Sequence, residues 1–114
     1  MGIGDLRRTK SDVKYQLVLQ WSGSSLKDYD EMIAMENKLM ENLSEGTEVD
    51  GHDVGSGEVN IFILTDDPEL TFSEAKAILG DSDQWLSVRA AYREGAESHY
   101  AILWPEDLTD FAIA

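Results

Sequence analysis

An apolar run at residues 59–65 constrains the fold of this chain more than any other feature, because turn and helix signals flank it on both sides. The run is nearly continuous in Ile, Phe and Leu, which is typical of an interior strand with both faces covered. The preceding residues 47–58 are polar and rich in glycine, and they predict a short edge strand and a tight turn at 55–57. Asp67 followed by Pro68 is typical of a helix N-cap with proline at the first helical position, and Thr71 with Glu74 offers a competing helix start.

Side-chain periodicity predicts the remaining elements. Alternation of large apolar and polar residues predicts strands, and apolar residues at three- and four-residue spacing after Ser25 and Asp28, a capping pair, predict a long helix. The expected elements are strands at 15–21, within 47–58, and at 59–65, 86–93 and 99–104, and helices at 26–43 and from 68 to about 80. Ala90 and Ala91 leave a helix open as the alternative for 86–93. The predicted buried stripe of the first helix is Tyr29, Met32, Ile33, Leu39, Met40 and Leu43, with Met35 and Glu36 at its margins.

The order β-α-β-β-α-β-β predicts an α+β fold. It resembles a ferredoxin-like split β-α-β sandwich, with an antiparallel sheet of four to five strands and two helices on one face. We expect one domain at 14–114 after a flexible N-terminal tail at 1–13.

Four short motifs add a second resemblance. An Asp-Gly-His-Asp-x-Gly-Ser-Gly turn, an Asn-Ile-Phe-Ile strand and a Thr-Asp-Asp-Pro cap follow one another at residues 50–68, and Leu-Trp-Pro occurs at 103–105. In these motifs the chain is similar to small bacterial proteins of no assigned activity. The resemblance implies one compact domain and brings no catalytic residue with it.

Composition narrows the classes of partner. The 114 residues hold 23 acidic and 9 basic side chains, a net charge of -14, so neither nucleic acid nor a membrane is expected as a partner. Residues 1–14 are the exception, with four basic and two acidic side chains. Cysteine is absent, which excludes disulfides and thiolate-ligated metals. Without a long apolar run or a secretory signal, we expect a cytosolic protein.

Five residues around the 59–65 strand are candidate ligands of a divalent cation. Asp50, His52 and Asp53 precede the strand, and Asp66 and Asp67 follow it. Ordinary turn and cap chemistry explains the same residues, and their spacing matches no established metal motif. No cofactor is expected unless all five side chains surround one cleft.

Tryptophans near strand ends are candidates for an interface. Trp85 and Trp104 are the main candidates, and Arg89 and Arg93 on the alternate face would add salt bridges. Core packing is the competing interpretation. A sheet covered by only two helices can leave one face open, and such a face commonly becomes a dimer surface.

The sequence contains no recognisable catalytic constellation, and residues 26–58 hold ten acidic side chains against two basic ones. We therefore expect a non-enzymatic protein–protein interaction module. It would self-associate through its sheet as a homo-oligomer and bind a basic partner through its acidic surface. Two alternatives stay open: a divalent-metal-dependent enzyme or metal-binding protein, and a small-ligand sensor at a dimer seam.

Overall fold

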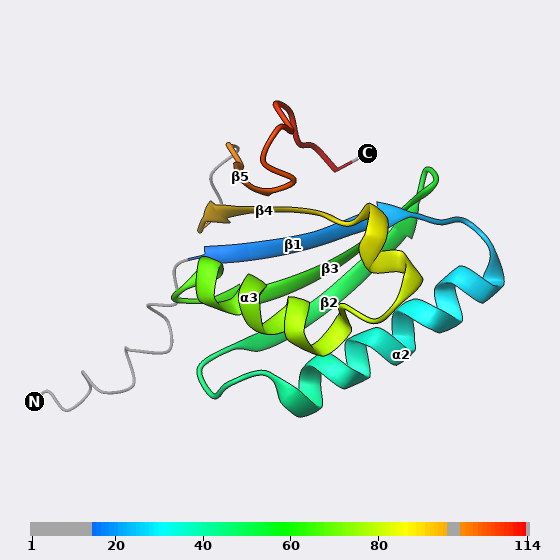
Figure 1. Cartoon of the computed structure of the whole chain (residues 1–114), viewed down its shortest axis with the longest axis horizontal. Helices are drawn as coiled ribbons and strands as arrows, with labels where there is room; N and C mark the ends of the chain where they lie inside the picture. Colours follow the sequence, from blue (N-terminus) through cyan, green and yellow to red (C-terminus); the bar gives the residue numbers. More distant parts are fainter. Residues whose placement is uncertain (1–14, 96–98, 114) are drawn as a thin grey trace, which may run out of the picture.

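The computed structural model describes residues 15–95 and 99–113 (Figure 1). Its elements are β1 (Tyr15–Ser22), α2 (Leu26–Asn42), β2 (Glu48–Gly55), β3 (Glu58–Thr65), α3 (Pro68–Leu79), the 3-10 helix η1 (Asp83–Ser87), β4 (Arg89–Glu94) and β5 (Ala101–Trp104). The predicted α+β class and the predicted order of strands and α-helices are confirmed. The predicted tail at 1–13 lies outside the described residues, as do residues 14, 96–98 and 114.

One five-stranded sheet has the order β2-β3-β1-β4-β5, and every neighbouring pair is antiparallel. The 59–65 strand is interior, as predicted, while β2 and β5 form the two edges. Gly55 and Glu58 close a two-residue hairpin whose central residues, Ser56 and Gly57, both have positive φ angles. Each edge strand also contains an irregularity: Asp50 bulges out of β2, and Leu103 is the extra residue of β5.

The two helices lie on the same side of the sheet, and the main core fills the space between (Figure 1). Alternate residues of β1 and β3 form the sheet side of this core, because residues two apart on a strand point to the same face. These core residues are paired across the two strands: Leu17 with Ile63, Leu19 with Ile61, and Trp21 with Val59. Neither helix in the described residues has the length and apolar composition that crossing a bilayer requires.

The buried stripe of α2 differs from the predicted one. Met32, Met35, Glu36 and Leu39 are buried, whereas Met40 is exposed. The buried residues have the spacing i, i+3, i+4 and i+7, which forms one face of an α-helix, and Met40 lies about 100° from Leu39 around the axis. Met35 and Glu36 were expected at the margins of the stripe and are instead buried; the burial of Glu36 is accommodated by a contact with a histidine on β2.

The strand predicted at 86–93 begins only at Arg89. Its first residues belong to η1, where the Trp85 N–H donates to the Ser82 carbonyl at 3.1 Å and the Val88 N–H donates to the Trp85 carbonyl at 3.2 Å. These local hydrogen bonds override the apolar alternation that had indicated a strand. The consequence is that Leu86 lies in solvent, 88% exposed.

Both predicted helix starts are confirmed. At α2, the Ser25 hydroxyl accepts from the Asp28 N–H at 3.0 Å, and the Asp28 carboxylate accepts from the backbone N–H groups of Ser25 and Ser24 at 3.0 and 2.9 Å. At α3, the Asp67 carboxylate accepts from the Leu70 N–H at 3.1 Å. Hydrogen bonds from the backbone of Ser25 and Ser24 favour the ionised form of Asp28, so its pKa is lowered from its ordinary value.

The capping box gives a pH-dependent prediction. A carboxyl whose pKa is lower in the folded than in the unfolded chain stabilises the fold above its ordinary pKa, and this stabilisation is lost as the pH falls through the folded pKa. Asp28→Asn should therefore be less stable than the wild type near neutral pH, and the difference should shrink below about pH 4. Urea denaturation across this pH range measures it. Asp30→Asn removes a neighbouring charge on α2 and is the control. A stability difference between the wild type and Asp28→Asn that does not change with pH would contradict the prediction.

Candidate functional site

The side of the sheet near β5 carries a partly exposed group of aromatic side chains. We call it the aromatic hollow: a surface hollow of about 220 Å³ lined by Phe72, Lys76, Trp85, Leu86 and Trp104. Phe72 and Trp85 stack with ring centroids 5.6 Å apart and an interplanar angle of 22°. The Lys76 ammonium lies over the Trp104 ring, 5.8 Å from its centroid.

Three elements build the hollow. Phe72 and Lys76 are four residues apart and lie on one face of α3. Trp85 and Leu86 come from η1, and Trp104 is the last residue of β5, opposite the buried Ala90. The pairing with Ala90 places Trp104 on the side of the sheet that carries the helices. Because β5 is an edge strand, Trp104 stays 39% exposed.

The structure therefore brings together two of the four predicted interface residues, Trp85 and Trp104. The two arginines lie elsewhere, because Arg89 and Arg93 are paired with Gln20 and Gln16 on the other face of the sheet. Arg89 forms an ion pair with Glu58 at 3.4 Å. Arg93 donates to the Gln16 side chain at 3.0 Å and lies over the Tyr100 ring.

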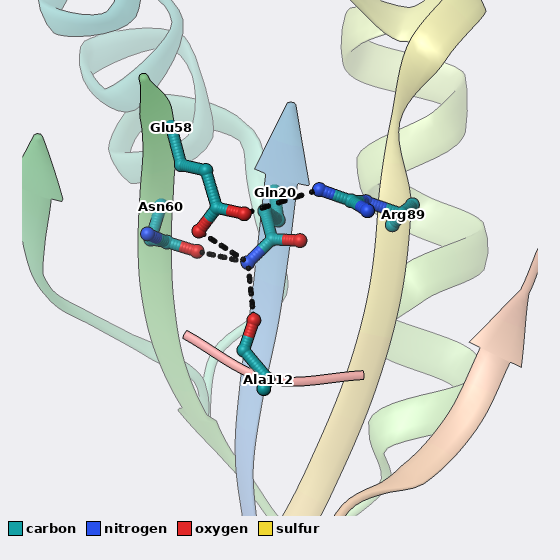
Figure 2. Close-up of polar contacts among 5 residues, drawn as sticks. All are labelled: Gln20, Glu58, Asn60, Arg89 and Ala112. Atoms are coloured by element: carbon teal, nitrogen blue, oxygen red, sulfur yellow. Dashed lines mark hydrogen bonds and ion pairs between the residues drawn. The ribbon is translucent and has the colours of Figure 1, made fainter. Parts of the chain in front are cut away.

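A buried polar cluster lies on this second face, and the sequence did not indicate it (Figure 2). The side-chain amide of Gln20, 1% exposed, donates to Asn60 Oδ1 at 3.0 Å, to the Ala112 carbonyl at 3.1 Å and to Glu58 Oε1 at 3.3 Å. Arg89 joins the cluster through its ion pair with Glu58. One sequence signal could have indicated this cluster: Asn60 lies within an otherwise apolar strand, and a buried asparagine side chain requires a polar partner.

The contact with Ala112 means that the C-terminal segment crosses the second face at β1 (Figure 2). Phe111 beside it contacts Tyr100, with ring centroids 5.1 Å apart. On the same face of the sheet, Val18 and Ala91 are paired and fully buried. The face expected to be open is therefore covered at its centre, and the larger exposed apolar side chains near β5 lie at the aromatic hollow.

The side chains in the first group of predicted metal ligands, Asp50, His52 and Asp53, point in different directions. His52 is paired with Ile61 on the helix-covered face, whereas its neighbour Asp53 is paired with Asn60 on the second face. Asp50 lies at the bulge of β2 and is exposed. The alternation of side chains along a strand thus separates residues that are close in sequence.

His52 instead contacts α2. Its Nδ1 lies 3.2 Å from both carboxylate oxygens of the buried Glu36. Its ring contacts the Tyr29 ring edge-on, with the ring centroids 5.8 Å apart. Glu36 was not among the predicted site residues. The contact joins α2 to β2 and supplies a polar partner for a carboxylate that burial would otherwise destabilise.

The second group, Asp66 and Asp67, lies at the start of α3. Asp67 caps the helix, and both residues line a shallow hollow of about 130 Å³ together with Glu45 and Glu74. Glu74 accepts from the Ser44 N–H and hydroxyl at 3.1 and 2.6 Å. Within residues 15–95 and 99–113, no three His, Asp or Glu side chains form a group able to hold a metal ion.

The alternative of metal binding by these residues has a direct test. A cation that binds only the folded chain must raise its melting temperature. We expect the same melting temperature in EDTA and in millimolar calcium, magnesium, manganese or zinc, because the five candidate side chains do not surround one cleft. A rise of several degrees with one cation, lost in Asp53→Ala or Asp67→Asn, would support the metal-dependent alternative.

No protein-family model, curated protein or solved structure matches the chain.

Proposed function

We propose that this chain is a non-enzymatic protein–protein interaction module that self-associates through the β5 side of its sheet. One observation carries the proposal: Leu86 and Trp104 are 88% and 39% exposed beside the stacked rings of Phe72 and Trp85. A contiguous exposed apolar surface is costly in water, and aromatic residues at its centre are the usual energetic anchors of protein interfaces.

A second copy of the chain is the partner that this surface fits best. A two-fold dimer needs a surface complementary to itself, and here a projecting leucine, Leu86, lies beside a hollow of matching apolar character. The sequence of β5, Ala-Ile-Leu-Trp, is uncharged. At the opposite edge, Glu48, Asp50 and Asp53 on β2 would repel the same residues of another copy.

Sedimentation velocity over a concentration series tests the proposal. The weight-average sedimentation coefficient should rise with protein concentration. It should rise further with added salt, because two copies with a net charge of -14 repel each other and salt screens that repulsion. A coefficient that stays at the monomer value up to near-millimolar protein, at every salt concentration, would refute self-association.

The acidic surface supports a second partner, a basic protein. The described residues include 20 acidic and 5 basic side chains, and the ion pairs among them involve only Glu31, Glu36 and Glu58. Such a surface would raise the association rate of a basic protein, and salt would weaken that complex, opposite to its effect on self-association. A cytosolic location and the absence of nucleic-acid and membrane partners stay predictions.

We also propose the ferredoxin-like arrangement as the finer description of the fold. Its support is the β-α-β-β-α-β order of the first six elements when η1 is set aside, with β3 between β1 and β2, and β1 between β3 and β4. The strand β5 is then an addition at one edge. In this description the added strand also creates the proposed interface, because it places Trp104 beside the helices.

A further inference from the structure

We propose that the aromatic hollow binds a small aromatic carboxylate, with the ligand ring against Trp85 and Trp104 and its carboxylate beside Lys76. The lining contains three aromatic rings and one cation, and it encloses about 220 Å³. Apolar walls with one placed charge are the usual composition of a small-molecule site. The inference goes beyond self-association, because one chain supplies every lining residue.

The aromatic side chains that line the hollow favour an aromatic ligand. Phe72 and Trp85 form a stacked pair in the lining, and Trp104 on β5 supplies the third ring. Aromatic rings prefer offset-stacked or edge-on neighbours, so a planar ring in the hollow could contact the lining rings. Leu86 extends the apolar rim.

The charge at the hollow selects an anion. Aromatic walls alone would favour a cation, but the Lys76 ammonium already lies over the Trp104 ring and would repel a second one. Within the described ranges, no carboxylate lies within 4.0 Å of the Lys76 ammonium. Its charge is therefore available to a ligand carboxylate, although the chain as a whole is strongly acidic.

The three tryptophans provide a site-resolved measurement. Each indole N–H gives one signal in a ¹H–¹⁵N correlation spectrum, and Trp85→Phe and Trp104→Phe assign the signals. Titration with sodium phenylacetate should shift the Trp85 and Trp104 signals to saturation. The Trp21 signal should not move, because Trp21 is 2% exposed in the core. Phenylacetamide and phenethylammonium carry the same ring with no charge and with positive charge.

Phenylacetate should bind more tightly than either analogue at physiological salt, where the Debye length is about 8 Å and the long-range repulsion from the acidic surface is screened. Lys76→Met should weaken phenylacetate about two- to five-fold, the range expected for one exposed ion pair, and leave phenylacetamide unchanged. Lys38→Met removes an exposed lysine from α2 and should change neither. The inference would be overturned if phenethylammonium bound as tightly as phenylacetate or more tightly. It would also be overturned if Lys76→Met and Lys38→Met lost the same affinity for phenylacetate.

A second copy covering the hollow would compete with the ligand, so the titration is repeated on the wild-type chain at decreasing protein concentration, which leaves the lining of the hollow intact. An affinity for phenylacetate that rises or stays constant on dilution supports the ligand site. Failure to shift the Trp85 and Trp104 signals at every protein concentration refutes it and leaves self-association to be judged by sedimentation.

Discussion

Replacing Gln20 with alanine should lower the free energy of unfolding by about 2 to 3 kcal/mol, among the largest effects expected for a polar residue in this chain. The Gln20 amide is buried and donates to Asn60, Ala112 and Glu58. Its removal leaves the Asn60 side-chain oxygen buried without that donor. The C-terminal segment also loses the hydrogen bond between Ala112 and β1. Urea denaturation followed by tryptophan fluorescence measures the change.

Gln16→Ala is the matched control for this substitution. Gln16 lies on the same strand and the same face, is only half-buried, and accepts one hydrogen bond from Arg93. Its loss should cost less than about 1 kcal/mol. Equal effects of the two substitutions would contradict a special role for the Gln20 cluster.

Leu86→Ser should weaken self-association on the order of 30-fold. A two-fold interface contains every residue twice, so a loss of about 1 kcal/mol at each site adds to about 2 kcal/mol per dimer. The fold itself should keep its stability within about 0.5 kcal/mol, because the side chain is exposed in the monomer. Sedimentation velocity gives the dissociation constant, and urea denaturation gives the stability.

Leu70→Ser provides the control for exposed leucine. Leu70 lies on α3 outside the aromatic hollow and is 55% exposed, so its replacement removes the same kind of apolar surface at another place. Self-association should not change. A similar loss in both variants would indicate nonspecific hydrophobic contact in place of the proposed interface.

The fold was predictable where local signals agreed with one another. Ser25 with Asp28 indicated the start of α2, and the apolar run at 59–65 indicated an interior strand. For α3 the sequence offered two starts, and the structure has the one with Asp67 as the N-cap and Pro68 as the first residue. The limits of β4 were not predictable from alternation. Leu86 and Val88 fit a strand pattern, yet hydrogen bonds within η1 determine the backbone there.

The candidate site was predictable only in part, because its residues meet through tertiary packing. Tryptophan composition near strand ends indicated Trp85 and Trp104, but nothing local indicates that Phe72 stacks on one and Lys76 lies over the other. His52 and Asp53 are neighbours in the sequence, but alternation along β2 points their side chains to opposite faces of the sheet. His52 contacts Glu36, a residue that the helical periodicity had placed at the margin of the buried stripe.

The most direct test of self-association through the aromatic hollow is a dilution series of the ¹⁵N-labelled wild-type chain, followed by its three indole signals. The account predicts that the Trp85 and Trp104 signals move with concentration and approach those of Leu86→Ser at the lowest concentration, while the buried Trp21 stays constant. Trp85 and Trp104 signals that stay constant while sedimentation reports association would place the interface elsewhere and contradict the account.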